Sequence, residues 1–369
     1  MALLQSLITV VLFLAILGSL VVIHELGHFI VARLAGIRVW EFGIGFPPRA
    51  TVLARRGETL YTLNWLPIGG FVKLEGEEGE SDDPRSLVRA SLPIRALVFA
   101  SGAIMNVILA FALMVAIAWF PQTAYGLTFA AVQAGSPAAA AGLAPGDLIV
   151  SLDGRHYDQI DPQVFISDLR AAAGRTVTLG VVRGGGATAT AATVEQITAT
   201  LRPPSQIDAG HGALGIEQLR YVPSTTAFTR TPAEAVATGS ARTADAFSTI
   251  AHGLAGIADA FVTRPTQAPE AAGPIGIAAT VGDVFWQVGI GATLYLAALI
   301  SANLALFNML PFPPLDGGRI VMAVIKSLVG TRVSVRIERL TYLVGFAFLF
   351  AFLIWVTFFD IARLGGAIQ

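Results

Sequence analysis

Four apolar stretches of this chain each run for 18 residues or more without a charged side chain. A helix that crosses a lipid bilayer needs about 20 consecutive, mostly apolar residues. Such a stretch is stable in lipid as a helix, because a helix satisfies its own backbone hydrogen bonds. We therefore predict four transmembrane helices, at residues 1–35, 96–120, 284–318 and 340–361.

The composition indicates the same class of protein. Hydrophobic residues make up 54% of the chain and charged residues 13%, whereas a soluble domain carries about 25% charged residues. This balance favours a polytopic α-helical protein embedded in a lipid bilayer. The net charge of −1 provides no basic field for nucleic acid. The absence of cysteine excludes disulfides, cysteine-ligated zinc and a cysteine nucleophile.

Lysine and arginine predict the orientation, because they are enriched in cytosolic loops. Nine lie in residues 33–95 and five in residues 312–339, while residues 121–283 also contain nine over more than twice the length of the first segment. We expect the loops at 36–95 and 319–339 to face the cytosol, and both termini and residues 121–283 to lie outside. The first stretch lacks a basic start and a small-residue cleavage site, which argues against a cleaved signal peptide.

Residues 121–283 differ in composition and are rich in alanine, glycine and threonine, and a small domain is expected at residues 125–220. Within residues 135–154, an alanine-rich helix, a Pro-Gly-Asp turn and a strand at Leu148–Leu152 follow one another. This order resembles the bacterial PDZ domain, which binds an extended peptide at a sheet edge. The alternative is a generic α/β module. Further strands are expected at Thr176–Val182 and Gly212–Ile216.

Residues 230–283 connect this segment to the third apolar stretch and contain an amphipathic pattern. Five apolar residues recur at spacings of three and four, which places them on one helix face. Such a helix could lie on the outer membrane surface or against the PDZ domain, or could be a simple linker. The five residues are Phe247, Ile250, Leu254, Ile257 and Phe261.

The first cytosolic loop, residues 36–95, contains an unusually apolar segment. Residues Thr59–Lys73 have strand-forming residues on both sides of a Pro-Ile-Gly-Gly break at 67–70, as in a β-hairpin. The segment is apolar enough to enter the bilayer, which requires cover from protein or a water-filled cavity. An ordinary cytosolic hairpin is the alternative.

The sequence His24-Glu25-Leu26-Gly27-His28 lies at the end of the first apolar stretch. Residues four apart share a helix face, so His24 and His28 can present two imidazoles to one metal ion. Glu25 is rotated by about 100° and can reach a water on the metal. Ionisable groups are costly within a membrane, and metal ligation reduces that cost for histidine. A structural His/Glu cluster is the alternative.

A catalytic zinc site needs a third protein ligand and one open position. Asp316 is the candidate, because it ends the third apolar stretch directly after three prolines, at 311, 313 and 314. Prolines break a helix, so the extended chain can turn the carboxylate toward the first helix. The glycines at 317 and 318 would then allow a tight turn into the second basic loop. A proline-kinked helix end with a solvated aspartate is the alternative.

Together, His-Glu-x-x-His and the segment Asn308–Gly318 resemble the site-2 protease family of intramembrane zinc metalloproteases, and the PDZ-like insertion resembles its RseP-type branch. The resemblance implies a zinc ion held by His24, His28 and Asp316, with Glu25 as the catalytic glutamate. It assigns Asn308 to the substrate strand or the oxyanion. Only one PDZ signature is present. Residues 101–106 resemble the second-span motif, with alanine at 103 where proline is expected, and position 47 has proline where glycine is usual.

The resemblance also implies the biological reaction. Family members perform regulated intramembrane proteolysis in the bacterial inner membrane, with the active site near the cytosolic side. Their substrates are single-span proteins, such as anti-sigma factors or remnant signal peptides, already cut outside by an upstream protease. The hairpin, with Gly69, Gly70 and Phe71, would bind the unwound substrate by strand addition. The PDZ domain would bind a peptide or exclude large ectodomains.

Two other classes of protein remain to be compared. A membrane adaptor with a structural His/Glu cluster would bind no metal, and it would not need Glu25 between the two histidines. A transporter with an intramembrane ion site would normally show repeated spans, and the two halves of this chain show no repeat.

Overall fold

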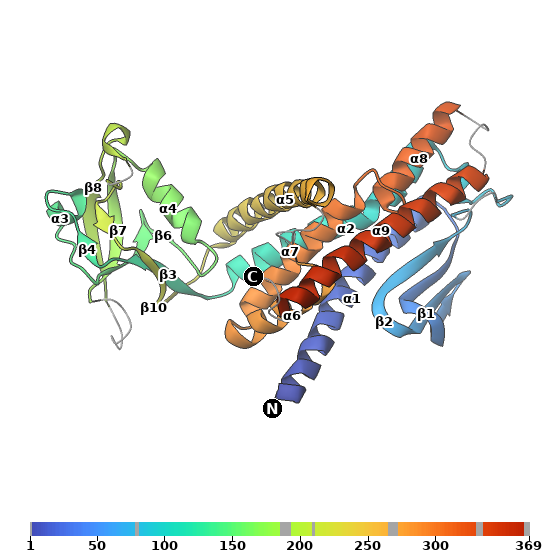
Figure 1. The fold of residues 1–369 in the computed structure, drawn as a ribbon, viewed down its shortest axis with the longest axis horizontal. Coiled ribbons are helices and arrows are strands. Elements are labelled where there is room, and N and C mark those ends of the chain that lie inside the picture. Colours follow the sequence, from blue (N-terminus) through green and yellow to red (C-terminus); the bar gives the residue numbers. More distant parts are fainter. Residues whose placement is uncertain are drawn as a thin grey trace. The chain divides into compact units, whose positions relative to one another are not determined.

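The structure is a computed structural model that describes residues 2–77, 81–184, 193–208, 211–264, 272–329 and 335–364. The chain divides into two compact units (Figure 1). One comprises Met1–Ile117 and Val236–Gln369, and the other Ala118–Ala235. Each unit is described by itself.

Long helices make up most of the first unit. Short turns and one β-structure connect them, and a 3₁₀ turn at Leu87–Arg89 precedes the second helix. The helices are α1 (Ala2–Leu34), α2 (Leu92–Trp119), α5 (Pro232–Thr263), α6 (Pro274–Gln287), α7 (Ile290–Asn308), α8 (Asp316–Val329) and α9 (Val335–Leu364).

Five of these helices are long and apolar enough to cross a membrane: α1, α2, α5, α7 and α9. Four of them lie on the four predicted apolar stretches. The fifth, α5, contains the amphipathic pattern, and sequence analysis does not count it as a span. The chain is thus a multi-pass membrane protein with an added β-region.

The apolar face of α5 packs on other helices of its unit. All five residues of the predicted face are half-buried. Phe261 meets three aromatic rings of α9 edge-on, with ring centroids 5.1 to 5.7 Å apart. Ala246 packs with Met114 of α2 and Ala298 of α7. Helices α2, α7 and α9 of the same unit therefore contact α5 on this side.

The third apolar stretch, predicted as one helix over 284–318, consists of three elements. Helix α6 ends at Gln287 and α7 begins at Ile290, because Gly289 adopts a φ of 105° that other residues avoid. Helix α7 ends at Asn308, and the prolines that follow keep residues 309–315 out of a helix. Asp316 then opens α8.

Gly317 and Gly318 serve close packing. A Cβ atom on Gly317 would lie 2.3 Å from the carbonyl oxygen of Met309, and one on Gly318 would lie 2.6 Å from that of Phe312. The predicted tight turn into a loop at 319–339 is therefore wrong for the described residues, since the first turn of α8 contains both glycines. Helix α8 runs to Val329, and residues 330–334 lie outside the described residues.

Strands β1 (Val39–Arg56) and β2 (Thr59–Leu74) form an antiparallel sheet beside α1 (Figure 1). The chain reverses at Gly57, with a φ of 61°, and again between residues 63 and 70, which include the predicted Pro-Ile-Gly-Gly break and Gly69 with a φ of 82°. Residues 60–63 run parallel to residues 41–44, whereas residues 70–73 run antiparallel to them. Residues 41–44 pair with residues 60–63 on one side and with residues 70–73 on the other. Residues 70–74 consequently lie at an edge of the sheet.

Small residues bring this edge close to α1. A Cβ atom on Gly69 would lie 2.9 Å from a methyl group of Val21, and one on Gly70 would lie 3.2 Å from a methyl group of Val22. Below the sheet, Leu74 and Val39 share a buried cluster with residues of α1, α2 and α8. The sheet edge is thereby held against the helices that carry the predicted site.

The second unit is built on one sheet in the order β10-β3-β5-β7-β8, with β6 paired to β5 and a separate pair β4–β9. The strands predicted at Leu148–Leu152 and Thr176–Val182 are β5 and β7. Of the strand predicted at Gly212–Ile216, only the last residue lies in a strand, β9. The other elements are β3 (Gln122–Thr128), β4 (Ala131–Val132), α3 (Pro137–Ala140), β6 (Arg155–His156), α4 (Pro162–Ala171), β8 (Val194–Thr200), a 3₁₀ turn (Pro204–Gln206), β9 (Ile216–Glu217) and β10 (Arg220–Phe228).

A buried ion pair ties the end of β10 to the start of α4. Arg230 lies 3.0 Å from Asp158 and 3.2 Å from Asp161, and all three side chains are less than a tenth exposed. The rings of Tyr157 and Phe165 stack within the apolar core of this unit, with centroids 4.1 Å apart. Charge pairing and core packing therefore stabilise the same corner of the sheet.

Candidate metal centre

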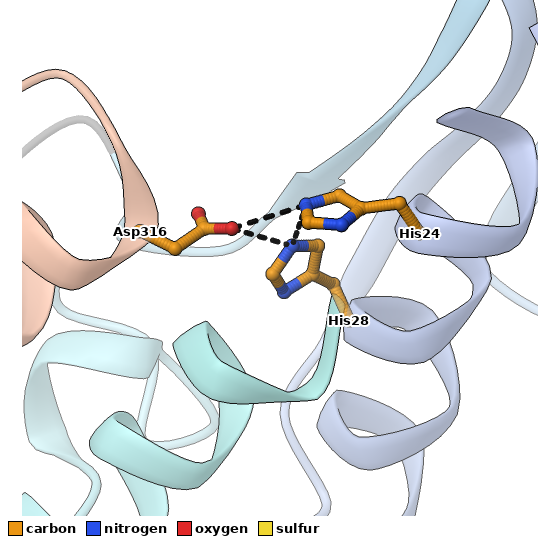
Figure 2. A group of neighbouring side chains, drawn as sticks. All are labelled: His24, His28 and Asp316. Carbon is orange, nitrogen blue, oxygen red and sulfur yellow. Dashed lines mark hydrogen bonds and ion pairs between the residues drawn. The ribbon is translucent and has the colours of Figure 1, made fainter. Parts of the chain in front are cut away.

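The structure brings the three predicted metal ligands together (Figure 2). Asp316 Oδ2 lies 3.1 Å from His24 Nε2 and 3.4 Å from His28 Nε2. The two Nε2 atoms are 3.2 Å apart. All three residues are buried. Two of them come from α1 and the third from the start of α8, 292 residues after His24.

These spacings fit a tetrahedral metal ion. A zinc ion about 2.0 Å from each ligand requires ligand atoms about 3.3 Å apart. The three measured separations lie within 0.2 Å of that value. Two imidazoles and one carboxylate leave a fourth position open, as a catalytic zinc site requires. Among the described residues, this is the one group of three or more acidic or histidine residues with ligand geometry.

Hydrogen bonds determine the tautomer of each histidine. His28 Nδ1 lies 2.7 Å from the carbonyl oxygen of Val98, so Nδ1 donates and Nε2 presents its lone pair to the centre. The side-chain nitrogen Nδ2 of Asn106 lies 3.3 Å from His24 Nδ1, and the Oδ1 of Asn106 is buried without a partner among the described residues. Exchanging the two amide atoms, which differ only in their assignment, gives Oδ1 a partner: it would accept the Nδ1 proton and leave Nε2 free for the metal.

Asn106 is fully buried on α2, and it was missed as a site residue by sequence analysis. Its backbone carbonyl accepts a hydrogen bond from the Ser301 hydroxyl at 2.9 Å, which fixes the helix beside the centre. The sequence does contain a signal for it, because a polar residue in the middle of an apolar span is uncommon and usually functional.

Two glycines allow α2 to approach the histidines. A Cβ atom on Gly27 would lie 2.3 Å from the carbonyl oxygen of Ser101. A Cβ atom on Gly102 would lie 2.4 Å from His28 Nε2 and 2.6 Å from His24 Nε2. The space in front of the two nitrogens is thus kept open because position 102 has no side chain.

Glu25 lies next to the three ligands without joining them. Its Oε2 accepts a hydrogen bond from the backbone N–H of Val72 at 3.1 Å. Glu25 also lines a hollow of about 240 Å³ together with His28, Asp316 and residues of the sheet edge. This position is suitable for acting on a molecule in the open position of the metal.

The predicted substrate-binding residues have separate locations. Gly70 and Phe71 line the hollow beside Glu25. Gly69 packs against α1. Asn308 is the last residue of α7 and is not among the described residues that line this hollow. Sequence analysis also missed Arg319, whose guanidinium lies 2.6 Å from Glu77 and borders the same hollow.

This metal centre lies among helices that are long and apolar enough to cross a membrane. The combination defines a membrane-embedded peptidase of the His-Glu-x-x-His type. The sequence profile of Peptidase family M50 matches residues 12–352. A protein of Clostridium perfringens, named as a candidate zinc metalloprotease, is 34% identical over 93% of this chain and 96% of its own length. Zinc metalloprotease RasP of Shouchella clausii is 25% identical over 96% of this chain and 99% of its own.

The chain therefore belongs to peptidase family M50, the site-2 protease family, and is a zinc-dependent membrane metalloprotease.

Proposed function

We propose that this protease hydrolyses a peptide bond in the transmembrane segment of single-span membrane proteins, with His24, His28 and Asp316 as zinc ligands and Glu25 as general base. One observation carries the proposal. Three buried ligand atoms at tetrahedral separations, two from the long apolar helix α1 and one from α8, lie beside Glu25 of α1.

Zinc, when bound, polarises the scissile carbonyl and activates water for attack. Glu25 then takes the proton of that water at a carboxylate oxygen and transfers it to the leaving nitrogen. The hydrogen bond from Val72 N–H keeps the carboxylate directed toward the hollow. His28 and His24 keep their protons on Nδ1 through Val98 and Asn106, so that both imidazoles act as neutral ligands.

The substrate is proposed to bind as an extended strand on residues 70–74. A peptide bond within a helix is hydrogen-bonded and covered, so the helix must unwind before the bond can be cut. The outer N–H of Val72 faces Glu25, which places this sheet edge at the catalytic hollow. Strand addition there would satisfy the backbone of the unwound segment. Residues that weaken a helix should therefore favour cleavage. Asn308 is retained as a candidate contact to the substrate or the oxyanion.

We place the protein in the bacterial inner membrane, with both termini and the second unit extracytoplasmic and the active site near the cytosolic side. The distribution of lysine and arginine supports this orientation. In this arrangement α5 packs against the other helices of its unit and does not cross the membrane. Polar residues along α5, Arg242, Asp245 and Asp259, favour that position over a span.

The second unit is proposed to be a PDZ domain that admits substrates after an upstream protease has removed their outer part. The order of α3, the following turn and β5 supports this assignment. Binding of the new tail and exclusion of large ectodomains would both give such control. Anti-sigma factors and remnant signal peptides are the substrate classes that this process would serve.

The decisive experiment compares wild type with Glu25→Gln in detergent. We expect both proteins to hold about one zinc per chain, because Glu25 is not a ligand. Only the wild type should cleave a single-span substrate. If the wild type binds no zinc after reconstitution, the ligand assignment fails and the adaptor hypothesis gains support. If Glu25→Gln cleaves at the wild-type rate, another group is the base.

A further inference from the structure

A second hollow, of about 560 Å³, adjoins the catalytic one. Its walls come from the sheet edge, from the start of α2, from α8 and from α9. The two hollows have five lining residues in common: Phe71, Val72, Glu77, Phe99 and Arg319. A peptide strand that runs along residues 70–74 past Glu25 would therefore continue into the second hollow.

The described residues that line the second hollow carry an excess of positive charge. They comprise five cations and two carboxylates. Arg319 pairs with Glu77 and Lys326 pairs with Glu338. The remaining three cations, Lys73, Arg95 and Arg339, have no carboxylate partner within the described parts of the chain. The Nε of Arg95 is buried there without a hydrogen-bond partner among the described residues.

A general enrichment of cations at one membrane face does not account for this arrangement. Such enrichment distributes lysine and arginine along loops. Here β2, α2 and α9, which are far apart in the sequence, each direct a cation into the same hollow. Positive charges that line a cleft focus the electrostatic field inside it, and this field attracts an anion.

We propose that this second hollow binds acidic side chains of the substrate, in the polar segment that flanks the cleaved bond. The proposal rests on the proposed proteolytic function and adds a charge specificity to it. Arginine binds carboxylates through paired, charge-assisted hydrogen bonds. Phe71, Phe99 and Pro314 provide apolar surface for the stem of the acidic side chain. The shared walls favour a peptide over a lipid headgroup as the ligand.

The test measures cleavage by the full, zinc-loaded chain in neutral detergent. Three series of single-span substrates carry an Asp-Asp, an Asn-Asn or a Lys-Lys pair. Within each series the pair is moved through the positions on both sides of the cleaved bond. We expect the acidic pair, at positions on one side only, to lower KM by about ten-fold relative to Asn-Asn, the scale of one charge-assisted pair. The lysine pair should raise KM.

Charge reversal tests which residues are responsible. Arg339→Glu changes an exposed residue of α9, and Arg95→Glu changes the half-buried cation of α2. Each should abolish the preference for Asp-Asp and improve cleavage of Lys-Lys. Arg336→Glu is the matched control, because Arg336 is exposed on the same helix and is not among the residues that line the hollow. Its substrate preference should equal that of wild type.

The outcomes separate the two proposals. If the wild type cleaves none of the substrates, the proposed function fails. If it cleaves all three equally well at every position, the charge specificity is refuted. Equal loss of activity on all substrates after Arg339→Glu, seen only in vesicles that contain phosphatidylglycerol, would instead assign the hollow to a lipid and overturn the proposal. Zinc content of each variant confirms that the fold is intact, and Arg339→Glu suffices where Arg95→Glu does not fold.

Discussion

Replacing Gly102 with alanine should abolish zinc binding while leaving the helices intact. The added Cβ atom would lie 2.4 Å from His28 Nε2 and 2.6 Å from both His24 Nε2 and His24 Cε1. These three atoms belong to imidazoles that are already held from behind by Val98 and Asn106. The new methyl group would crowd both Nε2 atoms that have to bind the metal.

The magnitude follows from the distances. Ordinary van der Waals contact begins at 3.4 Å, so the rings or α2 must move by about 0.8–1.0 Å to admit the methyl group. A metal site tolerates deviations of about 0.2 Å in its ligand distances. Loss of one group that orients a ligand already weakens metal binding by about 10–100-fold. We expect Gly102→Ala to reduce zinc affinity by at least about 100-fold, because it displaces both histidines.

The assay is zinc content after dialysis against a buffered series of free zinc concentrations, with thermal unfolding recorded in parallel. Alanine favours an α-helix over glycine by about 1 kcal/mol, so Gly102→Ala should not weaken α2 itself. Gly253→Ala is the matched control, since a Cβ atom there meets nothing within 4 Å on α5. A Gly102→Ala protein that binds one zinc with wild-type affinity would refute the geometry of this centre.

Three further changes test other parts of the structure. Asn106→Leu should lower zinc affinity by about 10–100-fold, measured by competition with a chelator, because His24 then loses its orienting partner; an unchanged affinity would remove Asn106 from the site. Arg230→Ala should destabilise the second unit by about 3–5 kcal/mol in denaturant unfolding of the full chain, since two buried carboxylates lose their cation; a loss below about 1 kcal/mol would show that water replaces it. The buried Asp360 carboxylate caps α6, because it accepts hydrogen bonds at 3.0 and 2.9 Å from the N–H groups of Gly273 and Gly276. Asp360→Ala should therefore lower the free energy of unfolding by about 0.5–2 kcal/mol. Asp360→Asn should lower it less, and equal losses for both variants would contradict the capping role.

Much of the site follows from local spacing in the sequence. His24 and His28 share a helix face because they are four residues apart, and any α-helix through them gives the same result. Asp316 is identifiable because it is an acid at the end of an apolar stretch broken by prolines. The zinc ligands could therefore be proposed before the fold was known, and the structure brings all three within 3.4 Å of one another.

Other features depend on which elements meet. Periodicity identified the apolar face of α5, but the partners of that face are rings of α9, about 90 residues further along the chain. Gly317 and Gly318 are compatible with a turn or with close packing, and only contact with the carbonyls of residues 309 and 312 decides between them. The pairing of residues 41–44 with two separate parts of β2 likewise requires the long-range register.

The sequence by itself determined the class of protein, the apolar stretches and the chemistry of the metal site, because each depends on residue type and on spacing over a few turns. Only the tertiary structure decided that Gly102 and Asn106 belong to that site, and that Lys73, Arg95 and Arg339 share one hollow. Those relations join positions that are distant in sequence, and their energies arise from contact distance, burial and charge, which exist only once the helices and the sheet have packed together.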